Sequence, residues 1–293
     1  MSLSTEHRVL AGRYQLAGKL GTGGMAEVHR GWDVLLRRFV AVKLSQFRGD
    51  SVGGSRFDNE IRTLARLSHP GVVSVYDAGT CGRTSFVVLQ LVEGPSLRAR
   101  LTDGVLSPAQ VRVLGHRLAD TLAHVHEHGV VHRDVKPSNI LLDETDTAYL
   151  ADFGLAHSLG SARLTNTRQI VGTASYLAPE QVRGEEVGPA ADVYALGLVL
   201  LECLTGYREY QGKRVEAAVA RLHRPPEIPR DLPADLGRLL ALMTSLSVRR
   251  RPTAARCAEM LRSGRISGVL PDELLCGGGA QHAGAGDTLR YRD

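Results

Sequence analysis

The chain has 293 residues, of which 43% are hydrophobic and 23% charged, as expected for a soluble globular protein with a sizeable core. Its net charge of +5 is small and spread along the sequence, which disfavours nucleic-acid or membrane-surface binding. The four cysteines, Cys81, Cys203, Cys257 and Cys276, show no metal-ligand spacing. The most apolar run, Val193–Leu201, is far shorter than the roughly 20 residues that cross a bilayer. We therefore expect a chain without a membrane segment.

The first 90 or so residues have the pattern of a sheet with one helix. Residues 14–47 contain three strand-like runs, "RYQLAGKL", "AEVHRGW" and "RFVAVKL", separated by glycine-containing turns. Apolar spacing predicts a helix over 55–68, and two more strand-like runs follow at 71–79 and 84–92. This part predicts a small β-rich lobe.

The rest of the chain is mainly helical. Ser107 has the position of an N-cap, with Pro108 at the first helical position, Gln110 completing a capping box and Gly129 at the stop. Two short strand-like runs, "NILLD" and "AYLAD", follow, and the pattern from Asp192 onward is helical apart from a loop. The sequence therefore predicts an α+β fold with two lobes and a cleft between them. The glycine-rich tail is expected to be flexible.

Two features of the small lobe are weak signals by themselves. "GTGGMAEV" (21–28) lies between two strands, and its glycines would allow a phosphate to approach the backbone. It lacks the helix of a dinucleotide fingerprint and the Gly-Lys-Ser/Thr of a Walker motif, so a plain glycine-rich hairpin is the alternative. Lys43 lies in the strand-like "VAVK", and a buried lysine needs an anionic partner, for which Glu60 is a candidate.

The stretch "HRDVKPSN" (132–139) concentrates polar groups between apolar neighbours. Burying them costs several kcal/mol unless they are paired or a ligand binds there. Asn139 together with Asp152 of "ADFGLA" can hold a divalent cation through oxygen ligands. Asp134 can accept a hydroxyl proton, and Lys136 can neutralise phosphate charge. This ordered set is what phosphoryl transfer from Mg-ATP requires.

The complete series of motifs resembles a eukaryotic-type protein kinase, and most of all the bacterial serine/threonine kinases of that superfamily. The motifs occur in the family order and are "GTGGMAEV", "VAVK", Glu60, "HRDVKPSN", "DFG", "GTASYLAPE", "DVYALG" and Arg251 in "RRRPT". The resemblance implies a bilobal kinase domain over 14–262. Its expected parts are an N-lobe at 14–89, a hinge at 90–94 and a C-lobe at 95–262, with an N-terminal extension at 1–13 and a tail at 263–293.

The resemblance implies a role for each matching residue. Asp134 would be the catalytic base and Lys136 would reach the γ-phosphate, while Lys43 would contact the α/β-phosphates and pair with Glu60. Asn139 and Asp152 would hold Mg²⁺, for which Mn²⁺ could substitute. The residues implied to bind ATP are Leu20, Gly21, Thr22, Gly23, Gly24, Val28, Ala41, Lys43, Leu89 (the gatekeeper position), Gln90, Val92 and Leu141. The residues implied to be structural are His132, Phe153, Glu180, Asp192 and Arg251, with Leu64 and Val75 completing a hydrophobic spine.

The implied acceptor is a protein serine or threonine. The "APE" segment is typical of kinases that act on proteins, whereas Lys136 in "DVKPSN" and Thr173 in "VGTASY" are typical of serine/threonine kinases. Thr173 would contact Asp134 and Lys136. Thr165 and Thr167 occupy the positions of activation-loop phosphothreonines, which implies autophosphorylation in trans through a transient homodimer. Four positions depart from the family pattern. Ala26 replaces the third glycine, and Gln90 stands where an acidic residue is frequent. His157 replaces an arginine that usually helps to bind the loop phosphate, and Glu209 replaces a proline at the substrate-docking rim.

Two other functions fit parts of the pattern. A catalytically inactive, ATP-binding pseudokinase scaffold would usually have lost the lysine or one of the two aspartates, and none is lost here. A small-molecule phosphotransferase usually lacks the "APE" segment. We expect ATP and protein substrates as partners, no nucleic acid, and a cytoplasmic location if the chain is complete.

Overall fold

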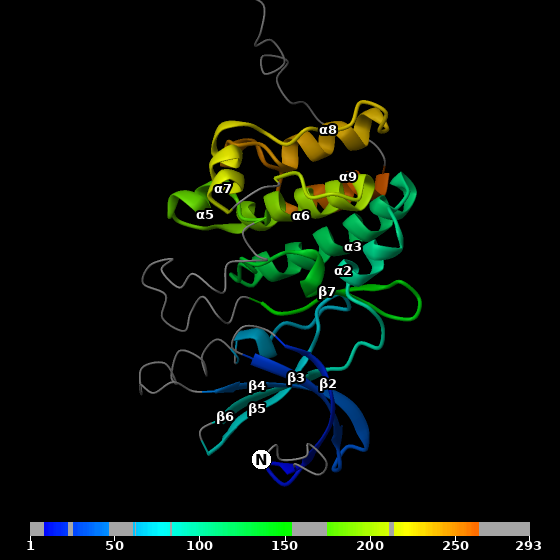
Figure 1. The fold of residues 1–293 in the computed structure, drawn as a ribbon, viewed down its shortest axis with the longest axis vertical. Helices are drawn as coiled ribbons and strands as arrows, with labels where there is room; N and C mark the ends of the chain where they lie inside the picture. The colour runs from blue at the N-terminus through cyan, green and yellow to red at the C-terminus, as the bar shows by residue number, and fades with distance from the viewer. Residues whose placement is uncertain are drawn as a thin grey trace, which may run out of the picture.

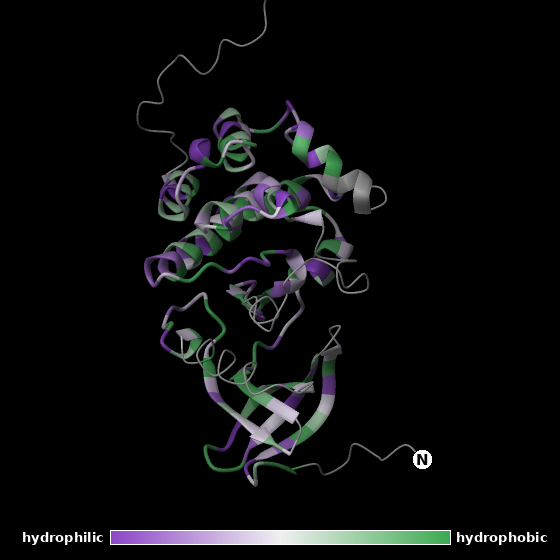
Figure 2. Ribbon diagram, turned by 90° about the vertical axis from the view of Figure 1, so that its left-hand side faces the viewer, coloured by the Kyte–Doolittle hydropathy of each residue, from purple (hydrophilic) through white to green (hydrophobic). Residues whose placement is uncertain are grey.

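The computed structural model describes residues 9–22, 26–46, 61, 63–82, 84–153, 175–210 and 214–263. A small lobe built on an antiparallel sheet and a larger helical lobe lie one above the other (Figures 1 and 2). The predicted α+β, two-lobed fold is confirmed. Several predicted functional residues lie outside the described residues: Gly23, Gly24, Glu60, His157, Thr165, Thr167 and Thr173. So does all of the tail beyond Ser263.

The small lobe contains a six-stranded antiparallel sheet with the order β1-β2-β3-β4-β6-β5. Its strands are β1 (Val9–Leu10), β2 (Tyr14–Thr22), β3 (Ala26–Asp33), β4 (Arg38–Gln46), β5 (Val75–Cys81) and β6 (Thr84–Gln90). Strand β1 lies in the segment that we expected to be an extension, and it pairs with β2. Along β4, Val40, Val42 and Leu44 face the core of the sheet. Because side chains alternate along a strand, Ala41 and Lys43 face the other way.

The large lobe begins with α2 (Leu97–Arg100), η1 (Leu101–Asp103) and the long helix α3 (Pro108–Glu127). The predicted capping box is present: the amide of Gln110 donates to the Ser107 hydroxyl, and the Ser107 amide donates to the Gln110 side chain at 2.9 Å. At the other end, Gly129 has a φ of 71°, the left-handed conformation that glycine adopts most readily. The helix ends where the sequence predicts.

A two-stranded sheet follows the polar stretch 132–139. It consists of β7 (Ile140–Leu142) and β8 (Ala148–Leu150), preceded by η2 (Pro137–Asn139). Backbone hydrogen bonds join it to both neighbouring parts: Leu142 donates to the carbonyl of Pro95 at 2.9 Å, and Val73 donates to the carbonyl of Leu150 at 3.0 Å. This small sheet therefore holds the polar stretch at the junction of the two lobes.

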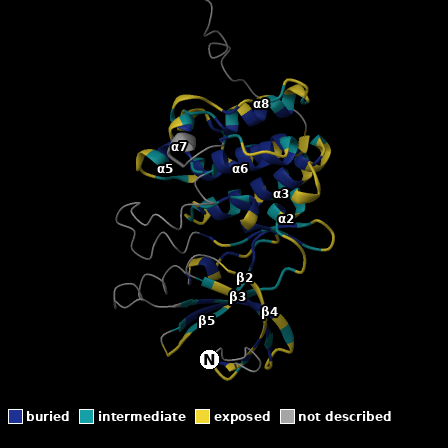
Figure 3. Cartoon of the chain, viewed as in Figure 1, coloured by how far each residue is buried: buried dark blue, intermediate teal, exposed yellow. Residues whose placement is uncertain are grey.

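The remaining elements are α5 (Pro179–Arg183), α6 (Pro189–Thr205), α7 (Arg214–His223), α8 (Ala234–Met243), η5 (Val248–Arg250) and α9 (Ala254–Ser263). Helix α6 is the centre of this lobe, because every residue from Ala191 to Cys203 is buried (Figure 3). The apolar run predicted to be a buried helix is part of α6. None of the helices in the described part of the chain has both the length and the apolar character that a membrane crossing requires.

Candidate active site

The polar stretch forms a compact arrangement around the Asp134 carboxylate. Lys136 Nζ lies 2.7 Å from Asp134 Oδ2, and the Asn139 amide nitrogen donates to the same oxygen at 3.0 Å and to the Asp134 carbonyl at 2.9 Å. The other carboxylate oxygen, Oδ1, is buried without a hydrogen-bond partner among the described residues. Such a buried acceptor is costly unless a ligand completes it.

The buried carboxylate of Asp192, on α6, holds this stretch from beneath. It accepts hydrogen bonds from the backbone amides of His132 and Arg133, each at 2.8 Å, and lies 2.9 Å from His126 Nε2 of α3. Arg133 has a φ of 65°, a strained conformation for a side chain of its size. The two backbone bonds to Asp192 stabilise that conformation immediately before Asp134.

His132 is fully buried, and each of its two ring nitrogens has a hydrogen-bond partner. Nε2 donates to the carbonyl of Ala151 at 3.0 Å, and Nδ1 accepts from the amide of Asp134 at 3.2 Å. Its ring lies 4.7 Å from the ring of Phe153. Leu64 belongs to the same buried cluster as Phe153, and Val75 packs against that cluster. The structure thus brings together the four residues of the expected spine.

Lys43, on β4, extends from the small lobe to Asp152 in the large lobe. Its Nζ lies 2.5 Å from Asp152 Oδ1. The Asp152 backbone has a φ of 55°, so the aspartate that follows β8 is also held in the left-handed region. Glu60, the partner that we expected for Lys43, lies outside the described residues. Asp152 is therefore the partner of Lys43 in the described part of the chain.

The strand registers place several of the expected nucleotide-contacting residues in one region of the sheet. Val28 on β3 lies opposite both Gly21 on β2 and Lys43 on β4, and Ala41 lies opposite Leu89 on β6. Leu20 and Thr22 flank Gly21 on β2, and Val92 lies just beyond β6. In the large lobe, Leu141 of β7 bridges to Ser96, which follows the predicted hinge. The Gln90 side chain accepts from the Ser74 amide at 3.4 Å, and is thus directed toward the small lobe itself.

The oxygen atoms of Asn139 and Asp152 are suited to binding a divalent cation together with a ligand. An Asn amide and an Asp carboxylate, from Asn139 and Asp152, supply the oxygen donors that hard cations prefer. The described residues contain no group of three or more His, Cys, Asp or Glu side chains that could hold a metal. A cation here would therefore take further ligands from phosphate and water, as Mg²⁺ usually does.

Two sets of charged side chains fix the start of α5 and the residues before it. Only some of these side chains were identified from the sequence. Arg251 forms a buried two-point ion pair with Glu180, with nitrogen–oxygen distances of 2.6 and 2.9 Å. The Tyr176 hydroxyl contacts both Arg98 of α2 and Glu202 of α6. Burial and the nearby Glu202 carboxylate raise the pKa of Tyr176, so its hydroxyl remains a donor. Tyr176 is within the quoted "GTASYLAPE" motif, but Arg98 and Glu202 lie in ordinary helical runs and were missed.

Comparison with known proteins identifies the family. Residues 14–261 match the protein kinase domain. The chain belongs to the protein kinase family. It is 37% identical to serine/threonine-protein kinase PknL of Mycobacterium tuberculosis over 278 residues, which cover 92% of this chain and 68% of PknL. The expected resemblance to bacterial serine/threonine kinases is confirmed, and the family implies the use of ATP and a divalent metal.

Two further relatives are longer than this kinase. PknD of M. tuberculosis is 43% identical over 212 residues, covering 71% of this chain and 32% of PknD. PrkC of Bacillus subtilis is 37% identical over 223 residues, covering 75% of this chain and 34% of PrkC. The kinase thus spans about a third of the length of each of these two relatives.

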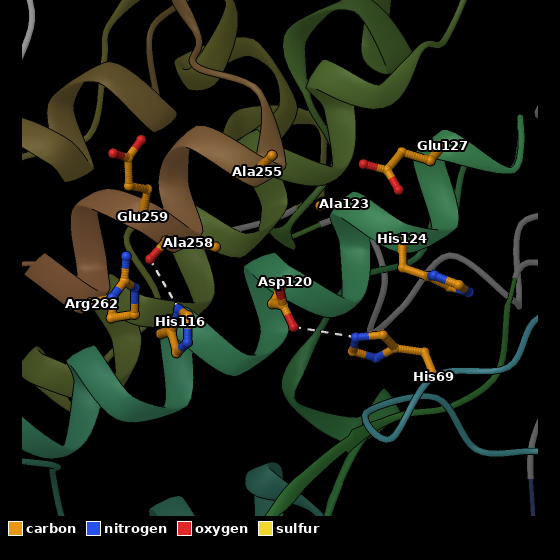
Figure 4. Close-up of a pocket in the computed structure, with 10 residues that line it drawn as sticks. All are labelled: His69, His116, Asp120, Ala123, His124, Glu127, Ala255, Ala258, Glu259 and Arg262. Carbon is orange, nitrogen blue, oxygen red and sulfur yellow. Dashed lines mark hydrogen bonds and ion pairs between the residues drawn. The ribbon is translucent and has the colours of Figure 1, made fainter.

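A separate pocket of about 390 Å³ lies between α3 and α9 (Figure 4). None of the residues of the polar stretch 132–139, the proposed catalytic loop, lines this pocket. His69 Nε2 lies 3.2 Å from Asp120 at one side, and His116 Nδ1 lies 2.9 Å from the carbonyl of Ala258 at the other. The His124 ring lies 5.1 Å from that of His69 and 4.3 Å from that of His128. This kinase therefore has three neighbouring imidazoles, those of His69, His124 and His128, outside the polar stretch 132–139.

Proposed function

We propose that this serine/threonine protein kinase transfers the γ-phosphate of Mg-ATP to hydroxyl groups of proteins, with Asp134 as the catalytic base. The observation that carries the proposal is the asymmetry of the Asp134 carboxylate. Oδ2 is engaged by Lys136 and Asn139, whereas Oδ1 is buried without a partner among the described residues. An acceptor hydroxyl would satisfy that oxygen.

In the proposed step, Asp134 accepts the proton of the serine or threonine hydroxyl. The hydroxyl oxygen forms a bond to the γ-phosphorus as the bond from that phosphorus to the β–γ bridging oxygen breaks, and ADP leaves with the bond's electron pair. Lys136, already beside Asp134, would neutralise negative charge on the transferring group. Bound Mg²⁺ would offset phosphate charge, and Asn139 and Asp152 would be its protein ligands.

The nucleotide would lie against the face of the sheet that carries Lys43. The apolar side chains of Val28, Ala41 and Leu141 would enclose the adenine, and Lys43 would contact the α- and β-phosphates. With a nucleotide bound, Lys43 would share its charge between phosphate oxygens and a carboxylate. The glycine-containing turn around Gly21, together with Leu20 and Thr22, would cover the phosphates.

Regulation through the loop between Gly154 and Ala178 is part of the proposal. Thr165 and Thr167 would be phosphorylated in trans between two copies, and Thr173 would contact the catalytic residues. The exposed side chain of Arg133, directly before Asp134, is a cation that such a phosphate could bind.

The direct test is phosphate transfer by the purified chain. Mix it with ³²P-labelled ATP, Mg²⁺ and a generic basic protein, and identify the labelled amino acids. We expect label on serine and threonine, and a loss of at least about 100-fold in Asp134→Asn, since a general base contributes roughly 10²–10⁴-fold. The matched control is Asp146→Asn, an exposed aspartate of the β7–β8 turn. A folded wild-type chain that binds ATP without transferring label would instead establish a pseudokinase.

A further inference from the structure

Arg221 on α7 is a buried cation with no assigned role in the reaction. It is 0% exposed, and its size makes it the largest fully buried side chain of the described residues. Burial lowers the pKa of Arg221 from its ordinary value, because the charged form is less stable away from water. Fully buried arginines are rare unless specific contacts compensate for the lost hydration.

Arg221 binds the segment that precedes α5. Its Nη1 donates to the carbonyl of Leu177 at 2.9 Å, and its guanidinium lies 5.0 Å from the centre of the Tyr210 ring. Helices α5 and α7 lie side by side (Figure 1). The arginine thus crosses from α7 to the backbone just before the "APE" motif.

Neighbouring residues of this segment are held by different elements. Tyr176 is bound by Arg98 and Glu202, on α2 and α6, whereas Leu177 is bound by Arg221 of α7. The next amide, of Ala178, donates to the Gln181 side chain at 2.8 Å. Residues 176–178 are therefore each held by a side chain from the large lobe.

This segment lies next to the catalytic loop. The Gln181 side chain donates to the carbonyl of Arg133 at 3.2 Å, one residue before Asp134. A protein acceptor that brings its hydroxyl to Asp134 must pass over the surface beside that residue. Ser175 and Leu177 are partly exposed there, whereas Tyr176 and Ala178 are buried beneath them.

We propose that Arg221 is a positioning residue for the protein acceptor: it fixes the Leu177 carbonyl and thereby shapes the backbone on which the acceptor lies. The proposal rests on the proposed phosphotransfer with Asp134 as base. It predicts that Arg221 affects acceptor binding and leaves the reaction of the nucleotide itself unchanged.

Arg224 provides a matched control on the same helix end. Its guanidinium lies 5.2 Å from the centre of the same Tyr210 ring, but its Nη1 forms an ion pair with Glu209 at 2.6 Å. The Arg224 side chain donates hydrogen bonds to Glu209 and to the carbonyl of Pro225, not to residues 175–178. Loss of Arg224 therefore removes a comparable contact with Tyr210 without releasing the Leu177 carbonyl.

The test compares Arg221→Met, Arg221→Lys and Arg224→Met. Measure KM and kcat for a peptide acceptor, KM for ATP, and ATP hydrolysis without acceptor. Hydrogen exchange of a peptide covering 175–183 reports the segment directly. In Arg221→Met we expect the acceptor KM to rise about tenfold, the scale of one hydrogen bond to a charged group, and exchange to become faster. Arg221→Lys should restore part of both, and ATP parameters should stay within about twofold.

The proposal is overturned if Arg221→Met changes the acceptor KM no more than Arg224→Met does. It is also overturned if acceptor-free ATP hydrolysis falls in parallel with acceptor phosphorylation. If Arg221→Met does not fold, Arg221→Lys decides: an unchanged acceptor KM and unchanged exchange overturn the proposal. A wild-type chain that phosphorylates no protein would overturn the proposed function, and the exchange comparison would still show whether Arg221 holds the segment.

Discussion

Lys43 and Asp152 form an ion pair across the two lobes, with 2.5 Å between Nζ and Oδ1, although 109 positions separate them in the sequence. Lys43 is mostly buried, whereas the Asp152 side chain is 43% exposed. The pair joins the two groups that we propose to act on the phosphates and on the metal. It therefore links the sheet of the small lobe to the residue that follows β8, at the place where the nucleotide would bind.

Replacing either member of this pair should abolish activity with little effect on folding. Lys43→Met and Asp152→Asn should each lower phosphotransfer by at least about 100-fold, because each removes charge from the proposed phosphate or metal site. The melting temperature should change by only a few degrees, since a partly exposed ion pair contributes about 0–1 kcal/mol. Phosphate transfer and thermal unfolding are measured on the same samples.

Lys19→Met is the control for this pair, because Lys19 forms an exposed ion pair with Glu27 at 2.8 Å. It should retain most of the wild-type activity. Substantial activity in a folded Lys43→Met or Asp152→Asn variant would contradict the assignment of the site.

Asp192→Ala should destabilise the protein and impair catalysis together. The substitution leaves the buried amides of His132 and Arg133 without their acceptor, at a cost of roughly 1–3 kcal/mol for each. We expect the free energy of unfolding, measured with urea, to fall by about 3 kcal/mol. Asp192→Asn keeps one acceptor oxygen and should lie between wild type and Asp192→Ala. Equal stability of all three proteins would show that Asp192 does not hold the loop.

Autophosphorylation should raise activity through Thr165 and Thr167. A phosphate adds about −1.5 to −2 charge and three acceptor oxygens, which could be bound by Arg133 and by Arg56, one turn before Glu60 in the helix predicted over 55–68. Mass spectrometry should find phosphate on one or both threonines after incubation with ATP. The double variant Thr165→Ala/Thr167→Ala should resemble the phosphatase-treated parent. If it is as active as the phosphorylated parent, this switch is absent, and His157 is the first position to investigate.

The neighbouring imidazoles of His69, His124 and His128 predict that the folded protein loses stability in acid. Burial, and next the positive charge of His128 and His69, lowers the pKa of His124, while Glu127 and Asp120 act weakly in the opposite direction. As the pH falls, His124 therefore binds a proton at about pH 6.5 in the unfolded chain, but only at a lower pH in the folded chain. This contribution to stability is fully present above about pH 7.5 and is lost as the pH falls through the unfolded pKa toward the lower folded value.

Thermal unfolding at pH 7.5 and 5.5 tests this expectation. His124→Gln should lose less melting temperature between the two values than wild type does. His223→Gln, at an exposed position of α7, is the control and should follow wild type. An identical acid-induced loss in His124→Gln and wild type would contradict the effect.

Local patterns in the sequence predicted most of the described elements, although they missed β1, and the helix predicted over 55–68 lies mostly outside the described residues. Alternation predicted the strands, and Ser107 with Gln110 predicted the start of α3, because such signals involve residues a few positions apart. The catalytic loop could be recognised because its residues lie within one short stretch. The partners of Tyr176 and Arg221 could not be predicted in the same way. Arg98 and Glu202 are 104 positions apart, and nothing in the pattern of a helix distinguishes a buried polar side chain from an exposed one.

The left-handed backbone conformations of Arg133 and Asp152 affect which substitutions this kinase can tolerate. Each adjoins or carries a proposed catalytic group, and each conformation is less costly for glycine than for the residue present. The geometry at these positions must be enforced by buried groups such as Asp192. Substitutions at buried positions of α6 such as Asp192, which do not bind the nucleotide, should therefore appear among the loss-of-function variants in a saturation mutagenesis screen. Tolerance to substitution in this kinase should follow the support of the loop rather than distance from the nucleotide.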